Sequence, residues 1–206
     1  GATGIVWLKL HFRTKGAHTL RSRDEPSAVL AAARAIERIS ALPMRRSPDE
    51  METWINIGMI GGGDVPNAQA RDAWFTVDLR SNDPDSLTRL EDRVLTIGEQ
   101  TAHAIGVRFD HETMHRMNGG RILGSESSTL VMMARRSLRA AGWESVDVTL
   151  RGTADHNVAI RHGIPGIAIG MTTGGGAHTP TEYADTAPLT TGIKQLLLLV
   201  LSPLTR

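Results

Sequence analysis

Apolar and polar residues alternate along the first half of the chain in a way that predicts β-strands. The first alternating run extends from Val6 to Phe12, with the polar residues Lys9 and His11 between apolar neighbours. A period of two places every second side chain on one face, which is typical of a half-buried strand. Similar runs predict further strands at 55–59, 75–79 and 107–114.

Two helices are predicted between these strands. An alanine-rich segment over 27–42 follows the start signal Asp24 and Pro26 and ends at Pro43, and Asp83-Pro84 begins a second helix with a regular apolar face. The element order β-α-β-β-α-β predicts an α/β fold of the split, ferredoxin-like kind. The first helix carries small residues that would suit close approach by a second copy: Ala28, Ala31, Ala32 and Ala35.

The second half of the chain has a different pattern. It predicts helices at 127–141, 157–161 and 190–201 and strands at 146–150 and 164–171. The last helix is apolar on nearly all sides and needs cover around most of its circumference. Because parallel strands need several neighbours and helices on both faces, we interpret this half as part of a larger α/β sheet.

Composition narrows the function classes. With 23 basic and 22 acidic residues the net charge is +1, which argues against an electrostatic nucleic-acid binder, and an aromatic content of 4% argues against RNA binding on the sheet. There are no cysteines, so a metal would need His, Asp or Glu ligands. The longest apolar run, 196–201, is too short to cross a bilayer. We therefore expect a soluble, cytoplasmic protein with no membrane partner.

Six short segments, in this order, carry the candidate chemistry. They are KGAHT at 15–19, INIGMIGGG at 55–63 followed by Asn67, VDLRS at 77–81, TADHN at 153–157, HGIPGIAIG at 162–170 and GGGAHTPTEY at 174–183. Together they resemble the zinc-dependent M20 family of peptidases, which includes peptidase T, carboxypeptidase G, aminoacylase and succinyl-diaminopimelate desuccinylase. The resemblance covers nearly the whole chain.

The resemblance implies an architecture and an activity. Residues 1–115 would form the lid and dimerisation domain, and 116–206 would form the C-terminal part of the catalytic domain. The family hydrolyses amide bonds of peptides or acyl-amino acids with a water activated by two zinc ions. It forms homodimers in which lids pair through an edge strand and a helix.

The resemblance also assigns site residues. His178 would be a metal ligand, with Glu182 beside it; an arbitrary histidine in a glycine-rich loop more often bonds a carbonyl group. His18 would enter the partner subunit's site and stabilise the oxyanion, although by itself it reads as an exposed residue at a strand end. Asn67 and Arg80 match positions that contact substrate, with a surface salt bridge as the alternative for Arg80.

One further segment departs from the family pattern. Asp155 is expected either to hydrogen-bond a metal-ligating side chain without binding the metal itself, or to cap a helix N-terminus. The adjacent His156 is unusual there, and we expect a solvated side chain rather than an additional ligand.

Most of the family's metal ligands and its general base have no match in this sequence. The family places them in a segment with a His-x-Asp motif, a bridging aspartate and a Glu-Glu pair. Two interpretations remain open. The chain is part of a longer metal-dependent amide hydrolase and inactive by itself, or it is a non-catalytic module that dimerises or binds a partner. We favour the first, because a pure interaction module has no use for His18, Asn67, Arg80 and His178 together.

Overall fold

The computed structural model describes residues 1–20, 24–44, 53–144, 146, 148–149 and 151–202. The chain forms two compact units: the first unit is Ala2–Gly120, and the second unit is Arg121–Arg206 together with Gly1. The predicted domain boundary after residue 115 falls within the last strand of the first unit.

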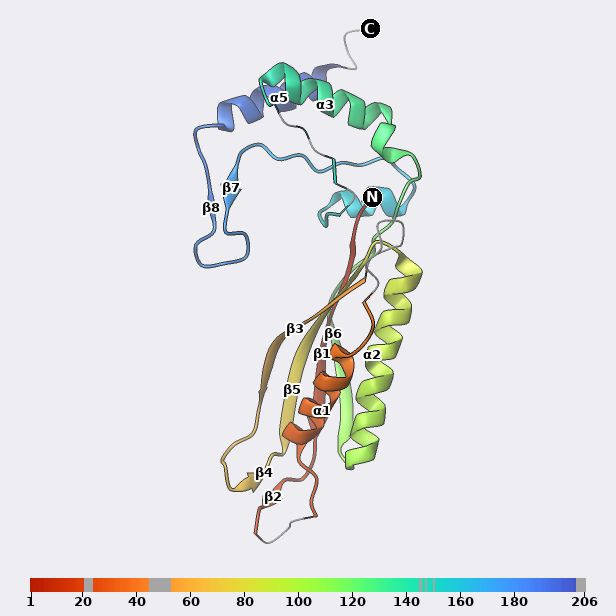
Figure 1. The fold of residues 1–206 in the computed structure, drawn as a ribbon, viewed down its shortest axis with the longest axis vertical. Helices are drawn as coiled ribbons and strands as arrows, with labels where there is room; N and C mark the ends of the chain where they lie inside the picture. Colours follow the sequence, from red (N-terminus) through yellow and green to blue (C-terminus); the bar gives the residue numbers. More distant parts are fainter. Residues whose placement is uncertain (21–23, 45–52, 145, 147, 150, 203–206) are drawn as a thin grey trace. The chain divides into compact units, whose positions relative to one another are not determined.

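The first unit is built on a four-stranded antiparallel sheet (Figure 1). Its strands are β1 (Gly4–Arg13), β3 (Thr53–Gly62), β5 (Asp72–Ser81) and β6 (Arg108–Met117). Their order across the sheet is β3-β5-β1-β6, with β1 and β5 in the centre and β3 and β6 at the edges. This arrangement confirms the predicted split α/β sandwich.

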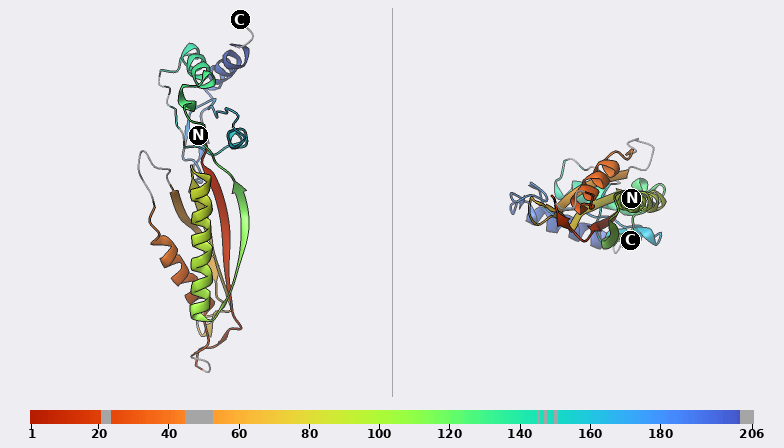
Figure 2. Two further views of the ribbon diagram at one scale, coloured as in Figure 1. Left: turned by 90° about the vertical axis from the view of Figure 1, so that its right-hand side faces the viewer. Right: turned by 90° about the horizontal axis from the view of Figure 1, so that it is seen from below.

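Two helices, α1 (Ala28–Ser40) and α2 (Pro84–Ile105), cover one face of this sheet (Figure 2). Each begins at a side-chain cap: the hydroxyl of Ser27 accepts from the amide of Leu30, and the carboxylate of Asp83 accepts from that of Ser86. The core between helices and sheet contains the alternating residues of β1, which are fully buried: Val6, Leu8, Leu10 and Phe12.

The alanine stripe of α1 has a different role from the one its sequence suggested. Its members are at most 1% exposed: Ala28, Ala31, Ala32 and Ala35. They face the sheet of their own unit, where small side chains let the helix lie close to the strands. The proposal that this stripe contacts a second copy is therefore wrong.

Two very short strands extend the first unit beyond the predicted elements. They are β2 (Ala17–His18) and β4 (Ala68–Gln69), which pair antiparallel with each other. Strand β3 is also longer than the predicted range 55–59 and continues to Gly62.

The second unit contains three helices in the predicted places: α3 (Thr129–Ala141), α4 (His156–Arg161) and α5 (Leu189–Leu201). A short 3-10 helix, Ser125–Ser127, precedes α3, and α3 packs against α5. A hairpin of β7 (Gly174–Gly175) and β8 (Tyr183–Ala184) lies between α4 and α5 in sequence.

The two strands predicted for the second unit are not formed in its described residues. Residues 146, 148 and 149 are irregular, and positions 147 and 150 lie outside the described residues. The segment 164–171 is also irregular, and its first residue, Ile164, is 59% exposed. A strand needs a neighbour for its backbone N–H and C=O groups, and no described residue forms a ladder with this segment. Among the described helices, none has both the length and the apolar character needed to span a membrane.

Candidate functional site

Two of the predicted site residues, His18 and Asn67, lie together at one end of the first unit. His18 pairs with Ala68 across the β2-β4 ladder, and the amide of Thr19 donates a hydrogen bond of 3.2 Å to the carbonyl of Asn67. Both side chains are exposed. Two-residue strands are too short to show a period, so the sequence pattern did not reveal this pairing.

Local backbone geometry brings these strands together. Gly16 has φ +73°, a conformation that side chains with a Cβ disfavour, and a Cβ there would lie 2.0 Å from Cγ of Arg71. The amide of Thr14 donates to the carbonyl of Arg71 at 2.8 Å. The glycine thus lets the chain turn from β1 into β2 directly against the start of β5.

The imidazole of His18 has a defined orientation of its ring nitrogens. Its Nδ1 accepts a hydrogen bond of 3.3 Å from the amide of Leu20. A neutral imidazole that accepts at Nδ1 carries its proton on Nε2. The exposed Nε2–H is therefore a hydrogen-bond donor, which is the property that stabilisation of an oxyanion requires.

Arg80 lies at the opposite end of the same sheet. It pairs with Ile5 at the start of β1, whereas Asp72, next to the β2-β4 ladder, pairs with Arg13 at its end. Eight residues of strand separate Arg80 from Asp72, about 27 Å at about 3.4 Å per residue. The structure therefore does not bring Arg80 to His18 and Asn67.

The guanidinium of Arg80 is held by its neighbour on the same face of β5. Its Nε lies 3.1 and 3.0 Å from the two carboxylate oxygens of Asp78, and one terminal nitrogen lies 2.8 Å from Oδ2. This is the surface salt bridge that the sequence left open as an alternative. The i, i+2 spacing of Asp78 and Arg80 on a strand was its sequence signal.

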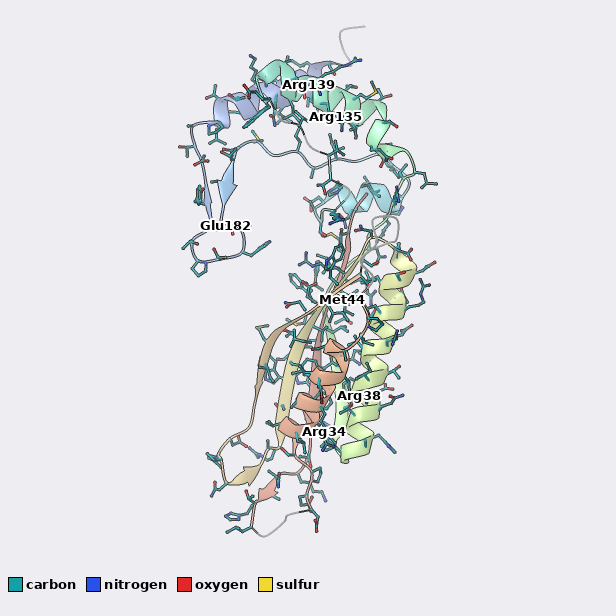
Figure 3. All side chains as sticks on the ribbon, in the orientation of Figure 1. Arg34, Arg38, Met44, Arg135, Arg139 and Glu182 are labelled. Carbon is teal, nitrogen blue, oxygen red and sulfur yellow. The ribbon has the colours of Figure 1, made fainter. Side chains whose placement is uncertain are left out.

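His178 lies in the loop that joins β7 and β8. Its φ is +63°, and it is the one non-glycine residue with a positive φ among the described residues. The carboxylate of Glu182, which is labelled in Figure 3, accepts a hydrogen bond of 3.0 Å from the backbone amide of His178. Glu182 therefore contacts the main chain of His178.

The glycines before His178 serve the hairpin itself. A Cβ on Gly174 would lie 2.4 Å from the carbonyl oxygen of Tyr183, and one on Gly175 would lie 3.0 Å from the Tyr183 ring. Gly176 has φ +67° and begins the loop. These glycines therefore allow β8 to approach β7 closely.

Asp155 and His156 depart from their predicted environments. Asp155 occupies the N-cap position of α4 in an α-helical conformation, and its carboxylate makes no capping hydrogen bond. The carbonyl oxygen of the Asn157 side chain instead accepts from the amide of Ala154 at 3.2 Å. His156 is half-buried rather than solvated, and its Nδ1 is buried without a hydrogen-bond partner in the described structure.

His156 lines a cavity of about 350 Å³ inside the second unit. Most of its other lining residues are apolar and come from α3, α4 and the irregular residues 146, 148–149 and 165–170. Trp143 also lines it, and its indole N–H is buried without a partner in the described residues. Two residues that line the cavity therefore each have a buried polar atom without a hydrogen-bond partner among the described residues.

The described residues hold no group of three or more His, Asp or Glu side chains placed to bind one metal ion. A catalytic zinc site uses about three protein ligands. His178 is exposed and supplies one imidazole. The donor set of the described residues therefore does not fit a zinc ion.

Several solved structures share the fold of this chain. A tripeptidase from Staphylococcus aureus is 24% identical with a TM-score of 0.77, over 97% of this chain and 51% of its own. The aminopeptidase PepT from Bacillus cereus is 23% identical with a TM-score of 0.74, over 97% and 52%. An amidase of the hydantoinase/carbamoylase family from Burkholderia vietnamiensis is 20% identical with a TM-score of 0.65, over 98% and 48%.

The chain spans about half the length of these proteins. No curated protein matches its sequence. Residues 1–105 match the family model of the peptidase dimerisation domain, and this match covers most of the first unit, including β1 to β5 and α2. The chain therefore belongs to the M20 peptidase dimerisation-domain family.

Proposed function

We propose that this chain is the lid and the C-terminal catalytic portion of a metal-dependent amide hydrolase that acts on peptides or acyl-amino acids. The observation that carries the proposal is the pairing of His18 with the Asn67 segment, which leaves Nε2–H of His18 free to donate. The similar structures are described as a tripeptidase, an aminopeptidase and an amidase, all of which cleave amide bonds.

The chain's own residues have distinct roles in this proposal. His18 donates a hydrogen bond to the oxyanion that forms when water attacks the amide carbonyl, and such a donor contributes about 10²–10³ in rate. Asn67 contacts the substrate beside it. His178 contributes one ligand to a zinc site whose other ligands come from residues beyond this chain, since the described donor set is incomplete. This chain by itself is then inactive.

The geometry of the lid supports a site shared between two subunits. A small peptide is much shorter than the roughly 27 Å that separates the β2-β4 ladder from Arg80. One lid therefore cannot place both ends on the same substrate. If His18 and Arg80 act on one substrate, they come from two lids, as they would in a homodimer.

The two edges of the lid sheet differ, and the difference favours pairing through β3. The exposed residues of β6 are largely charged or polar, which discourages edge pairing: Arg108, Asp110, His111, Glu112 and Thr113. On β3, Met59 and Ile60 are 52% and 62% exposed. Helix α1 adds exposed Val29 and Leu30, and Val29 lies next to Gly63 at the end of β3. We call Val29, Leu30, Met59 and Ile60 the apolar edge.

Features of the second unit support its assignment as part of a larger domain. Seven apolar residues of α5 are between 37% and 61% exposed: Leu189, Ile193, Leu196, Leu197, Leu198, Val200 and Leu201. The segment 164–171 has no strand partner among the described residues, and two residues that line the cavity, Trp143 and His156, each have a buried polar atom without a described partner. Buried polar groups are normally hydrogen-bonded, so additional chain packed here would supply the missing cover and partners.

The proposal is tested first at the gene. Translation of the DNA upstream of Gly1 should show a His-x-Asp motif and a Glu-Glu pair in frame, and the longer protein should hydrolyse peptides or acyl-amino acids in a chelator-sensitive way. An upstream sequence without these motifs, and a longer protein without hydrolase activity, would favour the non-catalytic module instead.

A mixing experiment then tests the shared site. In that longer protein, His18→Ala and His178→Ala are each expected to be inactive. If His18 acts in the partner's site, a mixed dimer of the two variants holds one intact site, and an equal mixture recovers about a quarter of wild-type activity after random pairing. If His18 acts in its own subunit, no mixture recovers activity.

A further inference from the structure

The loop from Gly176 to Glu182 holds His178 in a conformation that a histidine rarely adopts. The left-handed region is sterically disfavoured for an ordinary residue, and such outliers persist only where the surroundings enforce them. At φ +63°, His178 is this kind of outlier. Something in the loop must therefore offset the strain.

Backbone and hydroxyl hydrogen bonds form the two sides of the loop. The amide and the hydroxyl of Thr179 donate to the carbonyl of Gly176 at 3.0 and 2.7 Å. The amide of Glu182 donates to the carbonyl of Thr179 at 3.1 Å. None of these bonds involves the backbone of His178.

The side chain of Glu182 supplies the missing contact. It folds back across the loop, and its Oε2 accepts from the amide of His178 at 3.0 Å. A bond from an amide to an ionised carboxylate is stronger than one between neutral groups. Glu182 is therefore the side chain that fixes the main chain at the strained residue.

This contact differs from the usual one beside a ligand histidine. A carboxylate there ordinarily accepts from the imidazole itself. Here the carboxylate is engaged by the backbone, and the described residues form no hydrogen bond to either ring nitrogen of His178. Both imidazole nitrogens are left available.

We propose that Glu182 is a positioning residue that holds His178 in its left-handed conformation and so presents an unbonded imidazole from the loop. This inference rests on the proposed function for the use of the imidazole, namely as a metal ligand. The placement itself rests on the loop's own contacts. The placement of His178 by Glu182 and its use as a metal ligand can therefore be disproved independently.

The test compares Glu182→Ala with Glu182→Gln in the 206-residue chain by nuclear magnetic resonance. Positive φ gives His178 a strong amide-to-Hα Overhauser effect within the residue, and its amide is protected from exchange by Glu182. Glu182→Ala should weaken the Overhauser effect and raise the amide exchange rate about fivefold or more, the effect of losing one charge-assisted hydrogen bond at an exposed site. Glu182→Gln keeps an acceptor oxygen and should restore most of both signals.

Two controls separate positioning from general stability. The exchange of the Val158 amide in α4, which donates to the Asp155 carbonyl, should not change in either variant. His178→Gly should keep the loop bonds, because glycine adopts positive φ without strain. Unchanged His178 signals in Glu182→Ala, or signals equally altered in Glu182→Gln, would overturn the proposal whether or not the longer protein is a hydrolase.

Discussion

The amide of Thr19 donates a hydrogen bond of 3.2 Å to the carbonyl of Asn67, and this bond fastens the His18 segment to the Asn67 segment. Its geometry depends on Gly16, where a Cβ would lie 2.0 Å from Cγ of Arg71. Gly16→Ala should therefore open the β2-β4 ladder, and hydrogen exchange at Thr19 should show the loss of protection.

Gly106 provides the matched control for this prediction. It has a similar φ of +83°, and a Cβ there meets no atom within 4 Å. Gly106→Ala should lower the free energy of unfolding by about 1–2 kcal/mol and leave Thr19 protected. Arg71→Ala should relieve the clash, so Gly16→Ala in that background should open the ladder less. If Gly16→Ala leaves Thr19 protected, the close approach of Arg71 is not what shapes this segment.

The isolated chain should carry well under one tightly held zinc per molecule and should not hydrolyse peptides. Its described residues offer no set of three ligands, and a catalytic zinc needs about three. Elemental analysis after dialysis against a weak chelator measures the first quantity, and a peptidase assay with added zinc measures the second. Stoichiometric zinc would indicate a ligand set that includes residues such as Asp155 and His156, and turnover lost in His178→Ala would show an independent active site.

The sequence predicted the first unit well because its signals are local and strong. The alternation from Val6 to Phe12 matches a strand with one fully buried face, and Asp83-Pro84 begins α2 as its capping chemistry requires. The alanines of α1 were misread because a stripe of small residues fits close packing on a sheet as well as on a second helix. The fold of the unit determines whether these alanines pack on its own sheet or on another helix.

The second unit and the site were harder to predict. The run 164–171 has strand composition, but a strand also requires a neighbour, and none of the described residues provides one. The proximity of His18 and Asn67 depends on a turn at Gly16 and on two-residue strands without a measurable period. The bond from the His178 amide to Glu182 depends on a positive φ, which a histidine in the sequence does not by itself predict.

The stability of the first unit should fall as the pH falls below about 6.5. Burial lowers the pKa of His11, and the positive charges of Arg13 and Lys9 lower it further, against the opposing effect of Asp72 and Asp110. A histidine whose pKa is lowered by folding binds its proton more readily in the unfolded chain. The free energy of unfolding is therefore unaffected by His11 above its unfolded pKa of about 6.5. It decreases as the pH falls from there toward the lower pKa of His11 in the folded chain.

The variant His11→Gln should reduce this pH dependence. Arg13 lies 3.3 Å from Nδ1 of His11, and glutamine can bond it without acquiring charge. Urea unfolding of both proteins at pH 7.5 and 5.0 gives the comparison, and groups common to both proteins cancel in the difference. Equal losses of stability in the two proteins on acidification would show that His11 does not titrate with folding.

The lid should form a homodimer through the apolar edge. Ile60 on β3 is 62% exposed, so Ile60→Asp can be accommodated in the folded subunit but places a charge in the predicted interface. We expect this variant to be monomeric at micromolar concentration by light scattering, while the wild type is dimeric.

The control is Met114→Asp on β6, which is 46% exposed at the other edge of the sheet and should leave the dimer intact. Ala32→Glu is unsuitable, because Ala32 is 1% exposed and a buried charge there would unfold the unit. The exposed leucines of α5 offer a second route to association. A monomeric wild type, or a dimer that survives Ile60→Asp and dissociates in Leu197→Asp, would show that the lid edge is not the interface.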